Sequence, residues 1–124
     1  MLRRGLAIGS QHLLTVQGRR SGQPRRTPVS IVTLDGARYI VAALDHAAWV
    51  GNVRESRSGS LTRAGRTENV VLAELPTAER GPIIRAFLSQ VRGGVRFFGS
   101  QTADEIVARA DRYPVFKVSA TPVR

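Results

Sequence analysis

Four arginines surround two glycines near the start of the chain, in the nine residues 18–26. The arginines are Arg19, Arg20, Arg25 and Arg26, and the glycines are Gly18 and Gly22. Glycine reaches backbone conformations that other residues avoid, so backbone N–H groups can approach bound oxygens while guanidinium groups supply forked donors. This chemistry suits a phosphate or a carboxylate. A strand-connecting turn whose arginines face water fits the same residues, because glycine, serine and proline are common in turns.

The charge of the whole chain also favours an anionic partner. Its net charge is +10, and residues 1–34 contain six arginines and no acidic residue before Asp35. Such basicity attracts nucleic acid, an anionic membrane surface or an anionic small molecule. Nucleic acid is the least favoured of these partners, because the seven aromatic residues are scattered and no nucleic-acid-binding motif is present.

The residue types also disfavour several kinds of catalysis. The chain has no cysteine, and its two histidines, His12 and His46, have no cluster of carboxylates around them. We therefore expect neither thiolate chemistry nor a metal centre, and no catalytic triad or carboxylate pair is evident. The 124 residues predict a single domain over 1–124. Without cysteines or a long apolar run, the expected location is cytoplasmic.

The pattern of apolar residues and turn signals predicts a mainly β fold with helices (α+β). Strands are expected over residues 11–17, 27–34, 37–44, 58–63, 68–75 and 113–118. Helices are expected over 49–56, over 77–91 with Thr77 as the cap, and from a capping box at Thr102 and Glu105. Asp35-Gly36 and Ala64-Gly65 predict tight hairpins. Six strands joined largely by hairpins predict a small antiparallel barrel with helices at its side.

Three segments of the sequence resemble the family of deazaflavin-dependent nitroreductases and quinone reductases. They are Gly18–Gly22 with Pro24, Arg25 and Pro28, then Trp49–Arg54, then Tyr113–Phe116. The resemblance implies a split β-barrel similar to FMN-binding oxidoreductases. It also implies an enzyme that uses coenzyme F420 and passes a hydride from the reduced deazaflavin to a small-molecule electron acceptor: a quinone, a nitro compound or an activated alkene. FMN is the alternative cofactor.

The resemblance also implies which residues bind the cofactor. Arg20, Ser21, Gly22 and Arg25 match the positions that hold the anionic tail, and Arg19 and Arg26 complete this basic group. Thr27, Pro28, Ala42 and Ala43 match positions beside the ring system, and Trp49, Asn52 and Arg54 match a segment next to it. Trp49 as a core anchor and Arg54 as a solvated helix residue remain alternative interpretations.

Two departures from the family pattern leave the substrate and the proton donor open. The loop before Trp49 is shorter than in many relatives, and Phe97 and Phe98 stand where better-known nitroreductases have tyrosines. These phenylalanines line an apolar substrate pocket or belong to the core. The sequence identifies no catalytic residue, although His46 is a candidate proton donor. The alternative function is a cofactor-free module on the same fold that binds lipid or an anionic ligand, with contact to an anionic membrane. Pairing into a homodimer is a further expectation.

Overall fold

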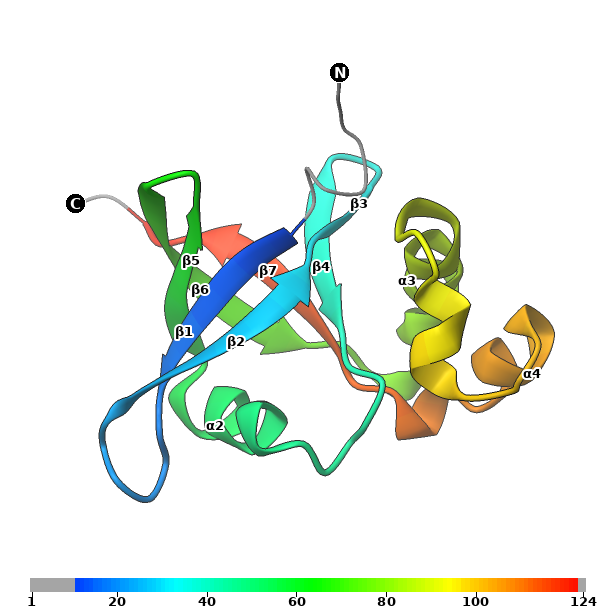
Figure 1. Cartoon of the computed structure of the whole chain (residues 1–124), viewed down its shortest axis with the longest axis horizontal. Helices are drawn as coiled ribbons and strands as arrows, with labels where there is room; N and C mark the ends of the chain where they lie inside the picture. Colours follow the sequence, from blue (N-terminus) through cyan, green and yellow to red (C-terminus); the bar gives the residue numbers. More distant parts are fainter. Residues whose placement is uncertain (1–10, 123–124) are drawn as a thin grey trace.

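A seven-stranded antiparallel sheet curls into a half-open barrel in the computed structural model, which describes residues 11–122 (Figure 1). The strands are β1 (Gln11–Gln17), β2 (Pro24–Ser30), β3 (Val32–Leu34), β4 (Ala37–Val41), β5 (Ser58–Arg63), β6 (Arg66–Glu74) and β7 (Val115–Ala120). Their order across the sheet is β2-β1-β5-β6-β7-β4-β3. The mainly β architecture with helices agrees with the prediction.

The seventh strand arises because the segment expected as one strand over 27–34 divides at Ile31. The part before Ile31 pairs with β1, and the part after it pairs with β4. These two short strands lie at opposite edges of the sheet. The run of β-branched residues predicts extended backbone correctly, but it carries no information about which neighbour each half will bind.

Both predicted hairpins are confirmed. Asp35 and Gly36 have φ values of 52° and 79° in the turn between β3 and β4. Ala64 and Gly65 have φ values of 52° and 77° in the turn between β5 and β6. Two successive residues with positive φ form the type I′ turn, whose twist matches that of the paired strands.

The helices cover two parts of the barrel (Figure 1). They are α2 (Ala48–Ser56), α3 (Thr77–Gln90) and α4 (Ala103–Ala108), with the 3-10 turns η1 (Gly94–Phe98) and η2 (Ala110–Arg112). The capping box is confirmed, since Glu105 N donates to Thr102 Oγ1 at 3.2 Å and Thr102 N donates to Glu105 Oε1 at 2.8 Å. Thr77 is not a cap: it is the first residue of α3, and Pro76 precedes it without a capping side chain.

Two apolar cores hold these layers together. The first fills the barrel, where Leu14, Ile40 and Phe116 are buried against Val50 and Val53 of α2. The second lies between the sheet and the other helices, and it includes Val32, Val115, Ile84, Phe87 and Ile106. Within residues 11–122, no helix has the length and apolar character needed to cross a membrane.

Candidate functional site

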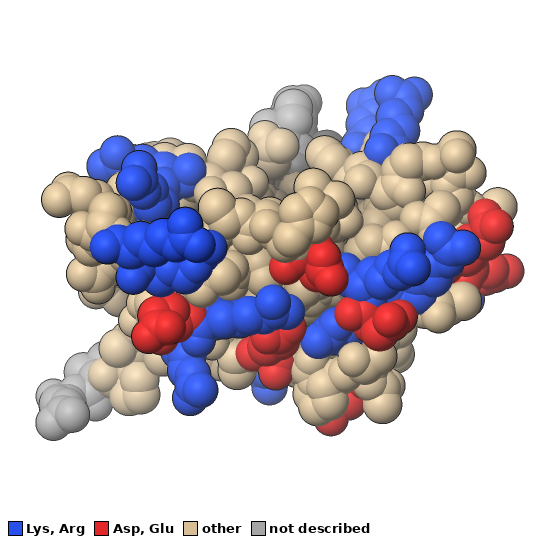
Figure 2. All heavy atoms as spheres, turned by 90° about the horizontal axis from the view of Figure 1, so that it is seen from below, with Lys and Arg blue, Asp and Glu red and all other residues tan. Residues whose placement is uncertain are grey.

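A basic pocket of about 460 Å³ lies between the β1–β2 turn and α2. It is lined by Gly18, Arg19, Arg20, Ser21, Arg25, Arg26, Thr27, Ala48, Trp49 and Asn52. Figure 2 shows basic side chains gathered at the end of the molecule where this turn lies. The fold therefore brings most of the predicted cofactor-binding residues to one cavity.

The β1–β2 turn is closed by its own hydrogen bonds. Gly18 N donates to Gln23 O at 2.8 Å, and Gly22 N donates to Gly18 O at 2.9 Å. Gly22 has a φ of 73°, a conformation that strongly favours glycine. Ser21 Oγ accepts from Gln23 N at 3.1 Å and from the Arg25 guanidinium at 3.3 Å. These contacts fix the backbone from which the arginines project.

Arg19 fastens this turn to α2. Its NH1 donates to Asn52 Oδ1 at 2.8 Å and to Ala48 O at 3.1 Å, and its backbone N donates to Asn52 Oδ1 at 3.1 Å. Gly51 makes room for the guanidinium, because a Cβ at that position would lie 2.8 Å from Arg19 Cζ. Arg19 and the buried Asn52 thus build the wall of the pocket.

The other three arginines of the turn are available to a ligand. Within residues 11–122, no acidic side chain forms an ion pair with Arg20, Arg25 or Arg26. Arg25 makes only the bond to the Ser21 hydroxyl. Three unpaired guanidinium groups around one cavity favour a ligand that carries several negative charges.

An apolar pocket of about 210 Å³ shares Trp49 with the basic pocket. Its lining residues are Gln11, Pro28, Val29, Ser30, Val41, Ala42, Ala43, Trp49, Phe87 and Phe97. Pro28, Ala42 and Ala43, which were predicted beside a ring system, all belong to it. Trp49 lines both pockets, and its ring lies 5.9 Å from that of Phe116 in the barrel core. It is therefore both a core anchor and a shared wall.

A third pocket of about 340 Å³ adjoins the apolar one through Ala43 and Phe97, which line both. Its other lining residues are Leu44, Asp45, His46, Phe98, Gly99, Arg112 and Tyr113. The two phenylalanines differ in exposure: Phe98 is 6% exposed, belongs to the core and lines the third pocket, whereas Phe97 is 61% exposed and lines both pockets. His46 is also exposed, with Nδ1 3.3 Å from Asp45 Oδ1.

Gln101 holds the wall of this third pocket. Its Nε2 donates to Phe98 O at 2.9 Å and to the Tyr113 hydroxyl at 2.8 Å. Its Oε1 is buried and has no hydrogen-bond partner within the described part of the chain. Leaving a buried acceptor unpaired costs about 1–3 kcal/mol. The two hydrogen bonds that Nε2 donates must offset this cost for the amide to keep this orientation.

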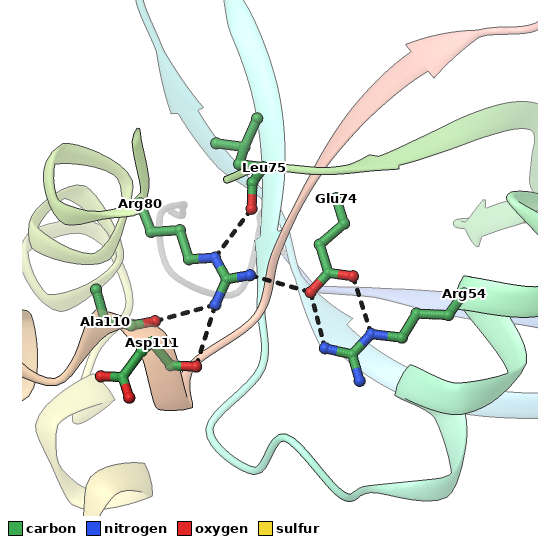
Figure 3. A network of polar contacts seen from close by, with 6 residues as sticks. All are labelled: Arg54, Glu74, Leu75, Arg80, Ala110 and Asp111. Carbon is green, nitrogen blue, oxygen red and sulfur yellow. Dashed lines mark hydrogen bonds and ion pairs between the residues drawn. The ribbon is translucent and has the colours of Figure 1, made fainter. Parts of the chain in front are cut away.

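Arg54 lies outside these pockets, in a network of charged groups (Figure 3). Its guanidinium donates to both carboxylate oxygens of Glu74, at 2.9 Å and 2.8 Å. Glu74 also accepts from Arg80 at 3.1 Å, and the Arg80 side chain is only 9% exposed. Arg80 further donates to Leu75 O at 3.0 Å and to Ala110 O at 3.1 Å. The network ties α2 to β6, α3 and η2.

This network was not predicted from the sequence, although one signal for it is present there. Arg80 lies three, four and seven residues before Ile83, Ile84 and Phe87, on the apolar side of α3. An arginine at that spacing predicts a buried cation that needs acceptors. Nothing in the sequence identifies Ala110 O as one of these acceptors, since it lies 30 residues away.

Stability should fall in acid because of Glu74. The hydrogen bond from Arg54 is the main cause that lowers the pKa of Glu74 below its ordinary value of 4.5, and burial opposes it. Between that lowered pKa and 4.5 the unfolded chain binds more protons, so the free energy of unfolding decreases as the pH falls through this interval. Urea unfolding between pH 3 and pH 7 measures this loss.

The matched variant for this measurement is Glu74→Gln. Glu68, whose pKa is lowered mainly by a hydrogen bond from Arg38, still titrates in the variant. The difference between the two proteins therefore isolates Glu74. We expect a smaller dependence of stability on pH in the variant, and identical slopes would contradict the ion pairing.

Comparison with known proteins decides the family. Residues 3–108 match the F420H(2)-dependent quinone reductase family. The chain belongs to this family. The F420-dependent reductases act with coenzyme F420 on a small-molecule acceptor, so the predicted enzyme class and cofactor are confirmed. A comparison with curated proteins finds no match.

Solved structures support the same fold for this F420-dependent reductase. A protein described as an F420-H2 dependent reductase is 20% identical, with a TM-score of 0.65 over 90% of this chain and 95% of that one. A domain-swapped dimer is 20% identical, with a TM-score of 0.64 over 90% and 81%. A putative pyridoxamine 5'-phosphate oxidase from Listeria innocua is 12% identical, with a TM-score of 0.61 over 94% and 88%. The predicted split barrel is confirmed.

Proposed function

We propose that this reductase binds F420 across Trp49 and transfers its hydride to a quinone. The single observation that carries the proposal is the adjacency of a cavity lined by unpaired arginines and a smaller apolar cavity, with Trp49 as their common wall. A ligand with a flat ring system and a long anionic tail matches this combination. The residues present therefore fit coenzyme F420.

In this proposal, Arg20, Arg25 and Arg26 bind the phosphate and carboxylate groups of the tail. Ser21 and the backbone of Gly22 hold the turn in its binding conformation, and Arg19 with Asn52 keeps the turn against α2. The ring lies against Pro28, Ala42, Ala43 and Trp49, and Thr27 lines the basic pocket next to Pro28 in the chain. When bound, the reduced cofactor supplies a hydride, and the apolar walls exclude water from the transfer.

Quinones are the substrate class that the third pocket and the family favour. The aromatic ring of Phe97 and the side chain of Leu44 offer apolar contact to a flat acceptor, and the pocket opens beside the cofactor site through Ala43. Nitro compounds and activated alkenes accept a hydride in the same position and remain alternative substrates.

The test is a titration of the purified protein with F420 and with FMN in parallel, followed by turnover assays. We expect saturable F420 binding, weaker FMN binding, and faster oxidation of reduced F420 with a soluble 1,4-naphthoquinone than with a nitroarene or an enone. Preference for FMN would contradict the proposed cofactor site. Preference for the nitroarene would leave the cofactor site standing and overturn the quinone assignment.

One observation favours a second property, contact with an anionic bilayer. Of the four large apolar residues that are exposed within residues 11–122, Leu44 and Phe97 line one pocket and Val95 lies on the same 3-10 turn as Phe97. Arg96 and Arg112 lie beside them and form no ion pair with a described acidic residue. Cosedimentation with vesicles that contain phosphatidylglycerol, compared with phosphatidylcholine alone, tests this contact.

Assembly and location remain proposals. The similar fold described as a domain-swapped dimer supports a homodimer for this chain. Light scattering coupled to gel filtration distinguishes a dimer from a 13.5 kDa monomer. A cytoplasmic location is the second proposal, and fractionation of the source cells measures it.

A further inference from the structure

We propose that Tyr113 is a catalytic residue whose hydroxyl donates a hydrogen bond, and then a proton, to the oxygen of the bound acceptor. The inference rests on the proposed function, because it needs an acceptor in the third pocket. Its basis is the hydrogen-bond arrangement around Gln101, which leaves the hydroxyl hydrogen of Tyr113 without a described acceptor, in a residue that is 7% exposed and lines that pocket.

The Tyr113 hydroxyl has one described hydrogen bond, and in it the oxygen is the acceptor. Gln101 Nε2 donates to this oxygen at 2.8 Å. A phenol oxygen that accepts a hydrogen bond keeps its own hydrogen for another partner. Within residues 11–122, no acceptor takes that hydrogen. Tyr113 is one of the residues that line the third pocket.

The second bond of Gln101 fixes which way its amide points. The same Nε2 donates to Phe98 O at 2.9 Å. If the amide were turned over, Oε1 would face this carbonyl oxygen, and two acceptors would meet without a hydrogen. The amide must therefore present its NH₂ group to both Phe98 and Tyr113. The Tyr113 hydroxyl consequently cannot donate a hydrogen bond to Gln101.

Packing fixes the Tyr113 ring within the second apolar core. The Tyr113 ring meets the Phe98 ring edge-on, with centroids 4.7 Å apart and an interplanar angle of 85°. The next residue, Pro114, accepts a hydrogen bond from Ala42 N at 2.8 Å. Because Ala42 lines the apolar pocket, this bond joins the segment that follows Tyr113 to the wall of the proposed ring site.

The reaction needs one proton beyond the hydride. Reduction of a quinone to a hydroquinone takes two electrons and two hydrogens, and the hydride brings both electrons and one hydrogen. Hydride addition to one quinone oxygen would shift the ring π electrons to the other carbonyl oxygen. That oxygen would form an O–H bond with the proton from Tyr113 Oη as the Oη–H bond breaks, and the electron pair of that bond would stay on the phenolate oxygen. The phenolate then regains a proton from water at the exposed side of the pocket, where Asp45 and His46 lie.

The first test compares Tyr113→Phe with Tyr39→Phe. Tyr39 is the only other tyrosine and lines none of the three pockets, so it is a matched control. With reduced F420 and a soluble 1,4-naphthoquinone, we expect kcat to fall about 100-fold in Tyr113→Phe. The solvent deuterium isotope effect on kcat should change with it, while the Kd for F420 and the melting temperature stay near the wild-type values. Tyr39→Phe should match the wild type throughout.

A second variant keeps the Tyr113 hydroxyl but gives its hydrogen an acceptor within the protein. In Gln101→Glu the carboxylate accepts the hydrogen of Tyr113, so kcat should fall although the tyrosine is present. The melting temperature and the Kd for F420, measured beside kcat, separate this effect from repulsion between the carboxylate and Phe98 O. An unchanged kcat and isotope effect in Tyr113→Phe would overturn the inference. A wild-type protein that binds no F420 or reduces no quinone would instead overturn the proposed function, so the two failures are distinguishable.

Discussion

The single substitutions Arg20→Ala and Arg25→Ala should each weaken F420 binding by about 10-fold to 100-fold. A charge-assisted hydrogen bond contributes about 1.5–3 kcal/mol when it is well formed, and about 1.4 kcal/mol corresponds to a factor of 10 in affinity. Neither guanidinium has an acidic partner within residues 11–122, so its loss leaves no counter-charge unpaired in the free protein. Fluorescence titration of F420 at two salt concentrations measures the effect.

The control is Arg66→Ala, which removes one positive charge from the exposed β5–β6 hairpin, outside the basic pocket. It should reduce affinity only slightly, because exposed charges are screened by salt at long distance. Equal losses in Arg25→Ala and Arg66→Ala would mean that general basicity attracts the cofactor. Unchanged affinity in both pocket variants would eliminate the proposed tail site.

The substitution Arg80→Met should destabilise the protein by about 2–5 kcal/mol, because it leaves two carbonyl oxygens without their donor at about 1–3 kcal/mol each. Methionine keeps much of the side-chain volume but leaves Leu75 O and Ala110 O without the donor that they have now. Glu74 keeps its bonds to Arg54, so its carboxylate still has a cationic partner. A melting temperature lower by about 10–20 °C is the expected result for a domain of this size.

Arg85→Met on the same helix is the matched control. Arg85 pairs with Asp104 at 2.8 Å, but the two side chains are 56% and 86% exposed. Exposed pairs contribute about 0–1 kcal/mol, so this variant should melt close to the wild type. If Arg80→Met melted as high as Arg85→Met, the network would have no part in stability.

Local signals in the sequence predicted the parts of the fold that depend on neighbouring residues. The two hairpin turns need only two residues with positive φ, and the capping box at Thr102 needs only Glu105 three positions later. The cluster of arginines around Gly18 and Gly22 likewise predicted a basic turn, and its four arginines line one pocket; that this pocket binds an anion stays a prediction. These features were predictable since each is closed by bonds within a few residues.

Contacts between distant segments were decided by the tertiary structure. Asn52 lies 33 residues after its partner Arg19, so their bond exists only once α2 packs under the barrel. The division of the predicted strand at Ile31 follows from pairing with β1 on one side and β4 on the other. Composition indicated that Arg54 was a cation but not that Glu74 would bind it away from the pocket.

The sequence alone therefore determined the barrel class, the turns and the basic segment of this reductase. Tertiary packing decided which arginines stay free for a ligand, because Arg19 and Arg54 find oxygens on other elements while Arg20 and Arg26 find none among the described residues. The type of a side chain determines which groups it can bind. Its available partners depend on which surfaces the cores bring together.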